Sequence, residues 1–551
     1  RMNKLYFLLF ILFSQISASA QVLEFSLIDS YEVADIEQVV ADFGAPQGFI
    51  TSRFAVDLYK VRYLTTNPVD NEPIEASGAL AVPRGLDCPL PLASYQHGTI
   101  AEKEDVPSRN NYEANIGKVF SSSGYVVCMP DYIGLGDSPG LHPYVHAKSE
   151  ADAAIDLLRA ARQLQDSLDF NLNDQLFIFG YSQGGHATMA LHKEIEQNHP
   201  FEFTVTCSAP MSGPYDLSGV QAEVITSENV YPTPGYLPYV VLSYQSVYGN
   251  LYNSLSEAFL PPYDTLLPEL FNGTYSMSYI NEQVPQIPNQ MLVEGQLDDF
   301  ENNPDNPIRL ALEDNDLWDW TPQAPLRIMY CDGDDQVNYQ NSVKAYERYV
   351  ENGAPNVQFF NFGPFTHSGC VLFCLIAGYN AFEAMKNSSN GMELSNFELS
   401  DAGLPEPNSG SLSFSASGGM MPYTFTLSDT LLSDSPLFEN LLPGNYELHV
   451  TDALGCYADT SIHIATQLSA SAIDGGAISF FPNPASDFVH FSTPEPGELK
   501  IFTSDGKLVA RISMQNKGIE IIPVATFPAG VYLAEFIGRS GTVTNSRIVL
   551  N

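Results

Sequence analysis

Between residues 90 and 330, apolar strand-like runs alternate with helical segments, and this alternation restricts the fold more than any other feature of the chain. Strand-like runs lie at 92–95, 124–129 and 175–180, and the segment 151–168 has apolar residues at helical spacing. Parallel neighbours need a crossover between them, which is usually a helix. We therefore expect an α/β domain in which helices cover both faces of a mostly parallel sheet.

A G-x-S-x-G pentapeptide centred on Ser182 follows the apolar run 175–180 and precedes a helical segment at 186–196. Gly180 and Gly184 permit the sharp strand-to-helix turn on which a serine of this motif sits, with its hydroxyl exposed. A serine hydroxyl is a weak nucleophile until a base accepts its proton. The motif therefore predicts a nucleophile at Ser182 that needs a histidine and an acid from elsewhere in the chain.

The expected chain order of such a triad is serine, then aspartate or glutamate, then histidine. His367 follows the strand-like run 357–360, and we expect it in a loop at the carboxyl edge of the sheet as the general base. Three aspartates follow the run 326–330. Asp334 is the preferred acid, because its D-x-x-V sequence leads into a helix, and Asp335 is the alternative.

An oxyanion that forms during acyl transfer needs at least two N–H donors. The first expected donor is the backbone N–H of Gln183, directly after the nucleophile. The second is the backbone N–H of Thr99, in the Q-H-G-T sequence after an early strand. His97 in the same sequence is expected to brace this loop.

With these residues assigned, the segment 56–384 resembles the α/β-hydrolase superfamily, and within it the secretory lipase branch. The resemblance implies hydrolysis of carboxylic esters without a cofactor, and we expect no metal site. Tyr330-Cys331 and Asn338 depart from the His-Gly and Pro that many members carry around the acid. The motifs that carry the resemblance are Y-Q-H-G-T at 95–99, P-D-Y-I-G-L-G at 130–136, G-Y-S-Q-G-G at 180–185 and D-W-T-P at 319–322.

The alternation of strands and helices is interrupted at about 217–317 by a Tyr- and Pro-rich segment. Insertions of this length are usually lids or caps. Tyr244, Tyr248 and Tyr252 lie at helical spacing within it. This stripe either packs the lid onto the main domain or forms a surface that binds an acyl group.

The two ends of the chain indicate export. Residues 1–20 combine a basic start, an apolar run of about nine residues and an A-x-A site, which predicts a signal peptide rather than a membrane anchor. The catalytic domain is expected at 21–386 and a linker at 387–404. Short strand-like runs with turn signals then predict two small β-sandwiches, at 405–466 and 475–551.

The first predicted β-sandwich, with G-G-M-M-P-Y-T-F at 418–425 and L-P-G-N-Y at 442–446, resembles the SprB-type repeat of bacterial surface proteins. The second, with F-P-N-P-A at 481–485 and P-A-G-V-Y at 528–532, resembles the type IX secretion C-terminal sorting domain. That resemblance implies a partner in the outer-membrane secretion machinery and passage through the periplasm. An ordinary carbohydrate-binding β-sandwich is the alternative.

The net charge of the chain excludes one class of function. The chain has 65 acidic and 24 basic side chains and a net charge of −41, which argues against nucleic-acid binding. Outside the signal segment no apolar run is long enough to cross a bilayer, so we do not expect an integral membrane protein.

Cys370 is expected to pair with Cys374, or either of them with Cys331 or Cys88. Zinc is the less favoured alternative, because the ligand spacing is wrong.

These observations lead to one hypothesis with two alternatives. The chain is expected to be a secreted or surface-bound serine hydrolase that cleaves carboxylic esters, including lipids, through an acyl-enzyme on Ser182. A serine exopeptidase of the same fold is the first alternative, since the same triad hydrolyses amides. A surface adhesin with an inactive hydrolase domain is the second.

Overall fold

The protein is described from a computed structural model, which covers residues 21–45, 50, 52–389, 392–403, 408–428, 431–467, 478–493, 495–504 and 506–550. The predicted signal peptide at 1–20 lies outside these residues. The chain divides into two units. The first runs to Glu393 and includes Ala416–Thr424 and Val450–Ala458, and the second contains the rest of the C-terminal region.

A nine-stranded sheet forms the centre of the first unit, in the order β1-β2-β3-β5-β4-β6-β7-β8-β9. Strands β1 to β3 and the β3–β5 pair are antiparallel, whereas every neighbouring pair from β5 to β9 is parallel. The predicted mostly parallel sheet is therefore confirmed. The strands are β1 (Val22–Tyr31), β2 (Val56–Thr66), β3 (Pro73–Pro83), β4 (Leu90–Gln96), β5 (Val126–Pro130), β6 (Leu172–Tyr181), β7 (Val205–Met211), β8 (Leu326–Tyr330) and β9 (Val357–Asn361).

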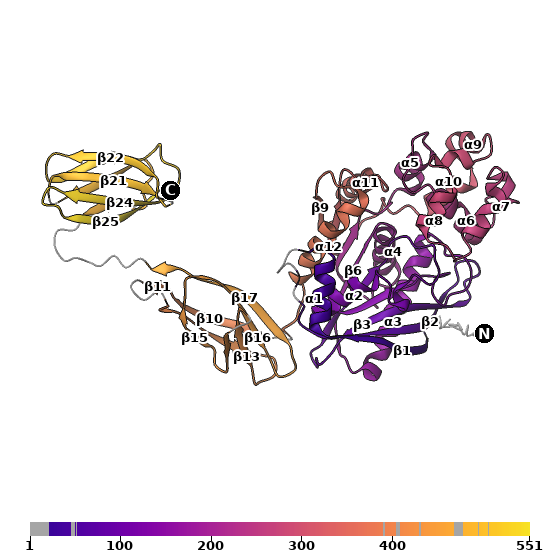
Figure 1. Cartoon of the computed structure of the whole chain (residues 1–551), viewed down its shortest axis with the longest axis horizontal. Helices are drawn as coiled ribbons and strands as arrows, with labels where there is room; N and C mark the ends of the chain where they lie inside the picture. Colours follow the sequence, from indigo (N-terminus) through magenta and orange to yellow (C-terminus); the bar gives the residue numbers. More distant parts are fainter. Residues whose placement is uncertain are drawn as a thin grey trace, which may run out of the picture. The chain divides into compact units, whose positions relative to one another are not determined.

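Helices cover both faces of this sheet (Figure 1). On β6, Phe177 and Phe179 pack on one side, against the apolar cluster that includes residues of α1 (Val33–Asp42), α2 (Ala114–Ser122) and α12 (His367–Glu383). Leu176 and Ile178 pack on the other side, with residues of α3 (Ala147–Leu168) and α4 (Gln183–Asn198). Because both faces are buried from Leu176 onward, that part of the strand is apolar without alternation.

The insertion between β7 and β8 is helical (Figure 1). Its apolar residues share a core with Ala101, Tyr144 and Val145, which lie outside the insertion. Tyr239 and Tyr244 of α6 are buried in that core. Gly249 ends α6 in the left-handed region, with φ of +71°, so Tyr252 lies outside the helix. The predicted helical stripe of three tyrosines is therefore wrong at its last member. The helices are α5 (Ala222–Thr226), α6 (Tyr236–Tyr248), α7 (Tyr263–Leu270), α8 (Met277–Gln283), α9 (Gln296–Asn302) and α10 (Pro307–Asp314).

The C-terminal region consists of small sheets of the β-sandwich type, as predicted. Strand β10 (Glu393–Ser400) lies within the segment expected as a linker, and it joins β12 (Gly410–Ser417) and β15 (Leu437–Leu441) in a sheet. In the last sandwich, Phe491 of β20 (Phe488–Thr493) shares a core with Phe536 of β24 (Gly530–Gly538), which belongs to the other sheet. No helix in the described part of the chain is long and apolar enough to cross a membrane.

Candidate active site

Ser182 occupies a strained turn between β6 and α4. Its φ of 63° and ψ of −123° are rarely adopted by a residue with a side chain. A Cβ atom at position 184 would lie 1.9 Å from the carbonyl oxygen of Gln96, and one at position 180 would lie 2.4 Å from the carbonyl oxygen of Gly184. Gly180 and Gly184 are therefore sterically required at this turn, as the pentapeptide predicts.

Asp334 and His367 form a close pair. Oδ2 of Asp334 lies 2.7 Å from Nδ1 of His367, and Oδ1 accepts hydrogen bonds from the backbone N–H groups of Gln336 and Val337 at 3.0 and 2.9 Å. Because the carboxylate accepts, Nδ1 carries the hydrogen of the neutral imidazole, and Nε2 is left as the proton acceptor. Nε2 of His367 is buried and has no hydrogen-bond partner among the described residues.

The backbone of His367 is held separately from its ring. Oδ1 of Asp335 accepts the backbone N–H of His367 at 3.0 Å, and the hydroxyl of Tyr181 donates to its carbonyl oxygen at 2.6 Å. The Tyr181 and His367 ring centroids are 4.9 Å apart. Thus both aspartates left open by the sequence contact His367, but only Asp334 contacts the imidazole. Tyr181, the residue before Ser182, packs directly against the histidine.

His367 is the first residue of α12, so its predicted position in a loop is wrong. Thr366 has extended backbone geometry, and its side chain accepts the backbone N–H of Gly369 at 3.3 Å. A threonine in this position is an N-cap, which starts a helix at the next residue. The backbone that carries the imidazole is therefore fixed as the first turn of α12.

A disulfide joins the acid and histidine segments. Cys331, directly after β8, pairs with Cys370 in the first turn of α12. This is one of the pairings that the sequence left open. The pairing of Cys88 with Cys456, within the first unit, was not predicted. Cys128, Cys207 and Cys374 are buried free thiols.

The two predicted oxyanion donors lie beside the turn at Ser182. Gln183 is the first residue of α4, so its backbone N–H has no acceptor within the helix. The 97–99 loop lies close to the strand end before Ser182: a Cβ atom on Gly98 would lie 3.7 Å from the carbonyl oxygen of Tyr181. The hydroxyl of Thr99 lies 3.0 Å from that of Tyr144. Buried His97 contacts the carbonyl oxygens of Gly98 and Asp131 at 2.7 and 3.3 Å, which braces the loop.

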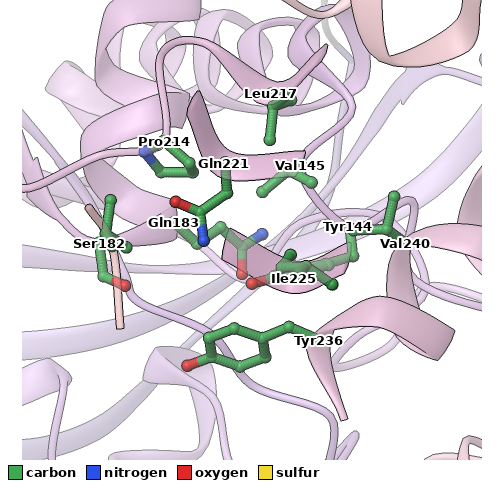
Figure 2. A pocket seen from close by; sticks show the side chains of 11 residues that line it. Tyr144, Val145, Ser182, Gln183, Pro214, Leu217, Gln221, Ile225, Tyr236 and Val240 are labelled. Carbon is green, nitrogen blue, oxygen red and sulfur yellow. The ribbon is translucent and has the colours of Figure 1, made fainter. Parts of the chain in front are cut away.

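Ser182 lines a pocket whose walls are mainly apolar (Figure 2). A second apolar cavity lies within the insertion. Sequence reasoning did not identify lining residues from the insertion such as Gln221 and Tyr236, because no motif links them to Ser182. The two cavities share Leu217, Gln221, Ile225 and Val240.

Two buried histidines lie behind the pocket. Burial lowers the pKa of His142 to about 3 and that of His146 to about 4. Nδ1 of His142 lies 2.9 Å from the carbonyl oxygen of Ile133, and Nδ1 of His146 lies 3.0 Å from the hydroxyl of Ser149. Both side chains are therefore neutral at pH 7 in the folded protein. Within the described residues, no group of three His, Cys, Asp or Glu side chains could hold a metal ion.

The free energy of unfolding of the first unit is expected to decrease as the pH falls from 7.5 to 5. The pKa values of His142 and His146 are lower when folded than the value of about 6.5 in an unfolded chain, so the unfolded state binds the additional protons. Linkage gives a loss of about 2 kcal/mol for each histidine at pH 5. Urea unfolding, followed by the fluorescence of Trp318 and Trp320, measures it. His146→Asn should remove about half of this loss, and an unchanged pH slope would contradict the assignment.

Comparison with known proteins places this site in a family. Residues 114–368 match the secretory lipase family, and residues 479–551 match the secretion system C-terminal sorting domain. A ligand-bound structure of the rice cell wall degrading esterase LipA from Xanthomonas oryzae is 30% identical, with a TM-score of 0.60, over 66% of this chain and 97% of that one. No curated protein is significantly similar in sequence.

Two further solved structures share the architecture of the first unit. A putative hydrolase from Legionella pneumophila is 29% identical, with a TM-score of 0.61, over 66% of this chain and 98% of that one. Candida antarctica lipase A in its closed state is 17% identical, with a TM-score of 0.52, over 66% and 83%, and shares the fold. On the match to nearly the whole length of the Xanthomonas esterase, the chain belongs to the secretory lipase family of α/β-hydrolases, a family of lipases and esterases, and it carries a C-terminal sorting domain.

Proposed function

We propose that this protein is a secreted serine hydrolase that cleaves carboxylic esters through an acyl-enzyme on Ser182. The observation that carries the proposal is the 2.7 Å contact between Asp334 and His367, which leaves a buried, unpartnered Nε2 on a histidine that packs against Tyr181, the neighbour of Ser182. A buried nitrogen without a partner is costly in a purely structural histidine. It is the arrangement that a general base requires.

In the proposed mechanism, Oγ of Ser182 attacks the ester carbonyl carbon while Nε2 of His367 accepts its proton. Asp334 stabilises the imidazolium that forms and keeps the ring in one orientation. The backbone N–H groups of Gln183 and Thr99 bind the oxyanion. Nε2–H of His367 then protonates the departing alcohol. Water, deprotonated by the same nitrogen, attacks the acyl-enzyme and releases the acid and Ser182.

The cavities favour an ester with an apolar acyl group over a peptide substrate. Among the described residues, no charged side chain lines either cavity, so they offer no carboxylate there that would bind the free amine of a peptide. The cavity in the insertion is continuous in its lining with the pocket at Ser182, since both use Ile225 and Val240. We propose that the acyl chain extends from Ser182 into this second cavity.

The C-terminal region supports export of the enzyme. The sorting-domain match at 479–551 supports a partner in the type IX secretion machinery of the outer membrane. A signal peptide at 1–20 would deliver the chain to the periplasm first. We also propose that residues 405–466 form an SprB-like repeat. The mature enzyme would act in the medium or at the cell surface.

Covalent labelling by a fluorophosphonate tests the proposed function. We expect stoichiometric labelling, with the adduct found by peptide mass spectrometry on Ser182, and loss of p-nitrophenyl ester hydrolysis in proportion to labelling. Aminoacyl p-nitroanilides should be hydrolysed far more slowly than the esters. Preferred turnover of the anilides would favour the exopeptidase. If neither labelling of Ser182 nor ester turnover is observed, the adhesin is favoured.

Val240→Trp is expected to reduce the hydrolysis of long-chain esters selectively, because the indole would fill the junction of the two cavities. We expect kcat/KM for p-nitrophenyl esters of C12–C16 to fall about 100-fold, which corresponds to about 2.7 kcal/mol, whereas the value for C2–C4 esters should change less than about 3-fold. Leu310→Trp is the matched control, since Leu310 is 47% exposed on α10. An equal loss at all chain lengths would contradict an acyl-binding role for this cavity.

A further inference from the structure

A buried polar cluster lies behind Ser182 and has no part in the proposed proton transfers. Glu150, in the first turn of α3, is 1% exposed. Its Oε1 accepts a hydrogen bond from Nε2 of Gln183 at 2.8 Å, and its Oε2 lies 2.8 Å from Nδ1 of His186. Burying a carboxylate is costly unless it is paired and hydrogen-bonded. Each oxygen of the Glu150 carboxylate therefore contacts one residue of α4, Oε1 the side chain of Gln183 and Oε2 that of His186.

The side-chain amide of Gln183 has only one favourable orientation. Its Nε2 also lies 2.8 Å from Nε2 of His142, whose Nδ1 contacts the carbonyl oxygen of Ile133. A carbonyl oxygen only accepts, so Nδ1 of His142 carries the hydrogen and its Nε2 is an acceptor. Both N–H bonds of the Gln183 amide are therefore used, one toward Glu150 and one toward His142. The reversed amide would place its oxygen against two acceptors.

His186 connects the same carboxylate to the end of the insertion. Its Nε2 lies 3.1 Å from the carbonyl oxygen of Asn315, the residue that follows α10. The side-chain oxygen of Asn315 accepts the backbone N–H of Ala147, the first residue of α3, at 2.8 Å. Glu150 thus lies at the centre of contacts that join α3, α4 and the last helix of the insertion.

We propose that Glu150 is a positioning residue, which acts through the side chain of Gln183 to hold the backbone N–H of Gln183 toward the oxyanion. This inference rests on the proposed function of Ser182 and Gln183. The φ of 63° at Ser182 is a strained conformation that persists only where the surroundings hold it. Anchoring the side chain of Gln183, the next residue, contributes to that constraint. A displacement of the N–H by about 1 Å is enough to impair catalysis about 100-fold.

Glu150→Gln tests this role, because the amide has the same size but keeps only one acceptor oxygen and carries no negative charge. We expect kcat for p-nitrophenyl esters to fall about 10- to 100-fold while KM changes less than about 3-fold, as for a contact made mainly in the transition state. Glu196→Gln is the matched control: Glu196 contacts His192 at 3.0 Å in the same helix, but at the end far from Ser182. Its kcat should be unchanged.

A double-mutant cycle with Gln183→Met separates positioning from general destabilisation. If Glu150 acts through Gln183, the double variant should be no slower than Gln183→Met alone. Additive losses in kcat, or a loss no greater than that of Glu196→Gln, would overturn the proposal. Should Glu150→Gln not fold, Gln183→Met breaks the same contact from the other side, and an unchanged kcat would be equally decisive. Failure of the proposed function is distinct, because the wild type would then lack Ser182-dependent turnover.

Discussion

Ser182→Ala is expected to lower kcat for ester hydrolysis by about 10⁵- to 10⁶-fold, because no other group in the pocket can form the acyl-enzyme. Removal of Oγ deletes few contacts, so the midpoint of thermal unfolding should change little. Initial rates on a p-nitrophenyl ester, with active-site titration of the wild type, measure the loss. Ser208→Ala is the control: its Oγ on β7 is buried without a hydrogen-bond partner among the described residues, and it does not line the pocket at Ser182. That variant should retain the wild-type kcat.

His367→Ala should cause a loss of similar size, since the nucleophile and its base act as one unit. The double variant Ser182→Ala/His367→Ala should then be no slower than Ser182→Ala alone. Multiplying losses would indicate that the two side chains act in separate steps. Retention of most activity in folded Ser182→Ala would exclude the serine mechanism.

Asp334→Asn is expected to lower kcat about 10⁴-fold, whereas Asp335→Asn should cost no more than about 10-fold. An asparagine at 334 can present an N–H to Nδ1 of His367, which favours the ring tautomer with hydrogen on Nε2 and removes the base. At 335 the side chain accepts only the backbone N–H of His367, and the asparagine oxygen can still do so.

The comparison of these two variants uses adjacent residues of equal charge, so each is the control for the other. Both should bind a substrate-like ester with nearly unchanged KM, because neither side chain lines the pocket at Ser182. Steady-state kinetics on one p-nitrophenyl ester provide both values. A larger loss in Asp335→Asn would reverse the proposed roles and would show that the backbone contact of His367 matters more than the contact to its ring.

Local features of the sequence predicted most of the first unit, because strands and helices follow from periodicity within a few residues. The apolar run of β6 and the glycines around Ser182 could be interpreted from the local sequence, because each has a steric cause. The start of α12 at His367 was missed, although Thr366 and the short spacing to Gly369 are a local capping signal. Strand β1 was also missed, since none of its residues is buried and it lacks the regular alternation of a half-buried strand.

What the sequence by itself determined is the order and type of the elements, the turn at Ser182 and a short set of candidate partners, because these depend on neighbours along the chain. Only the tertiary structure placed Asp334 rather than Asp335 at the imidazole of His367, paired Cys331 with Cys370, and gave the pocket at Ser182 and a cavity of the insertion shared lining residues. Glu150 was also beyond the sequence, since its contacts come from α4. Such choices depend on distances of a few ångströms between segments that lie tens of residues apart, and only the packing of the sheet and its helices sets those distances.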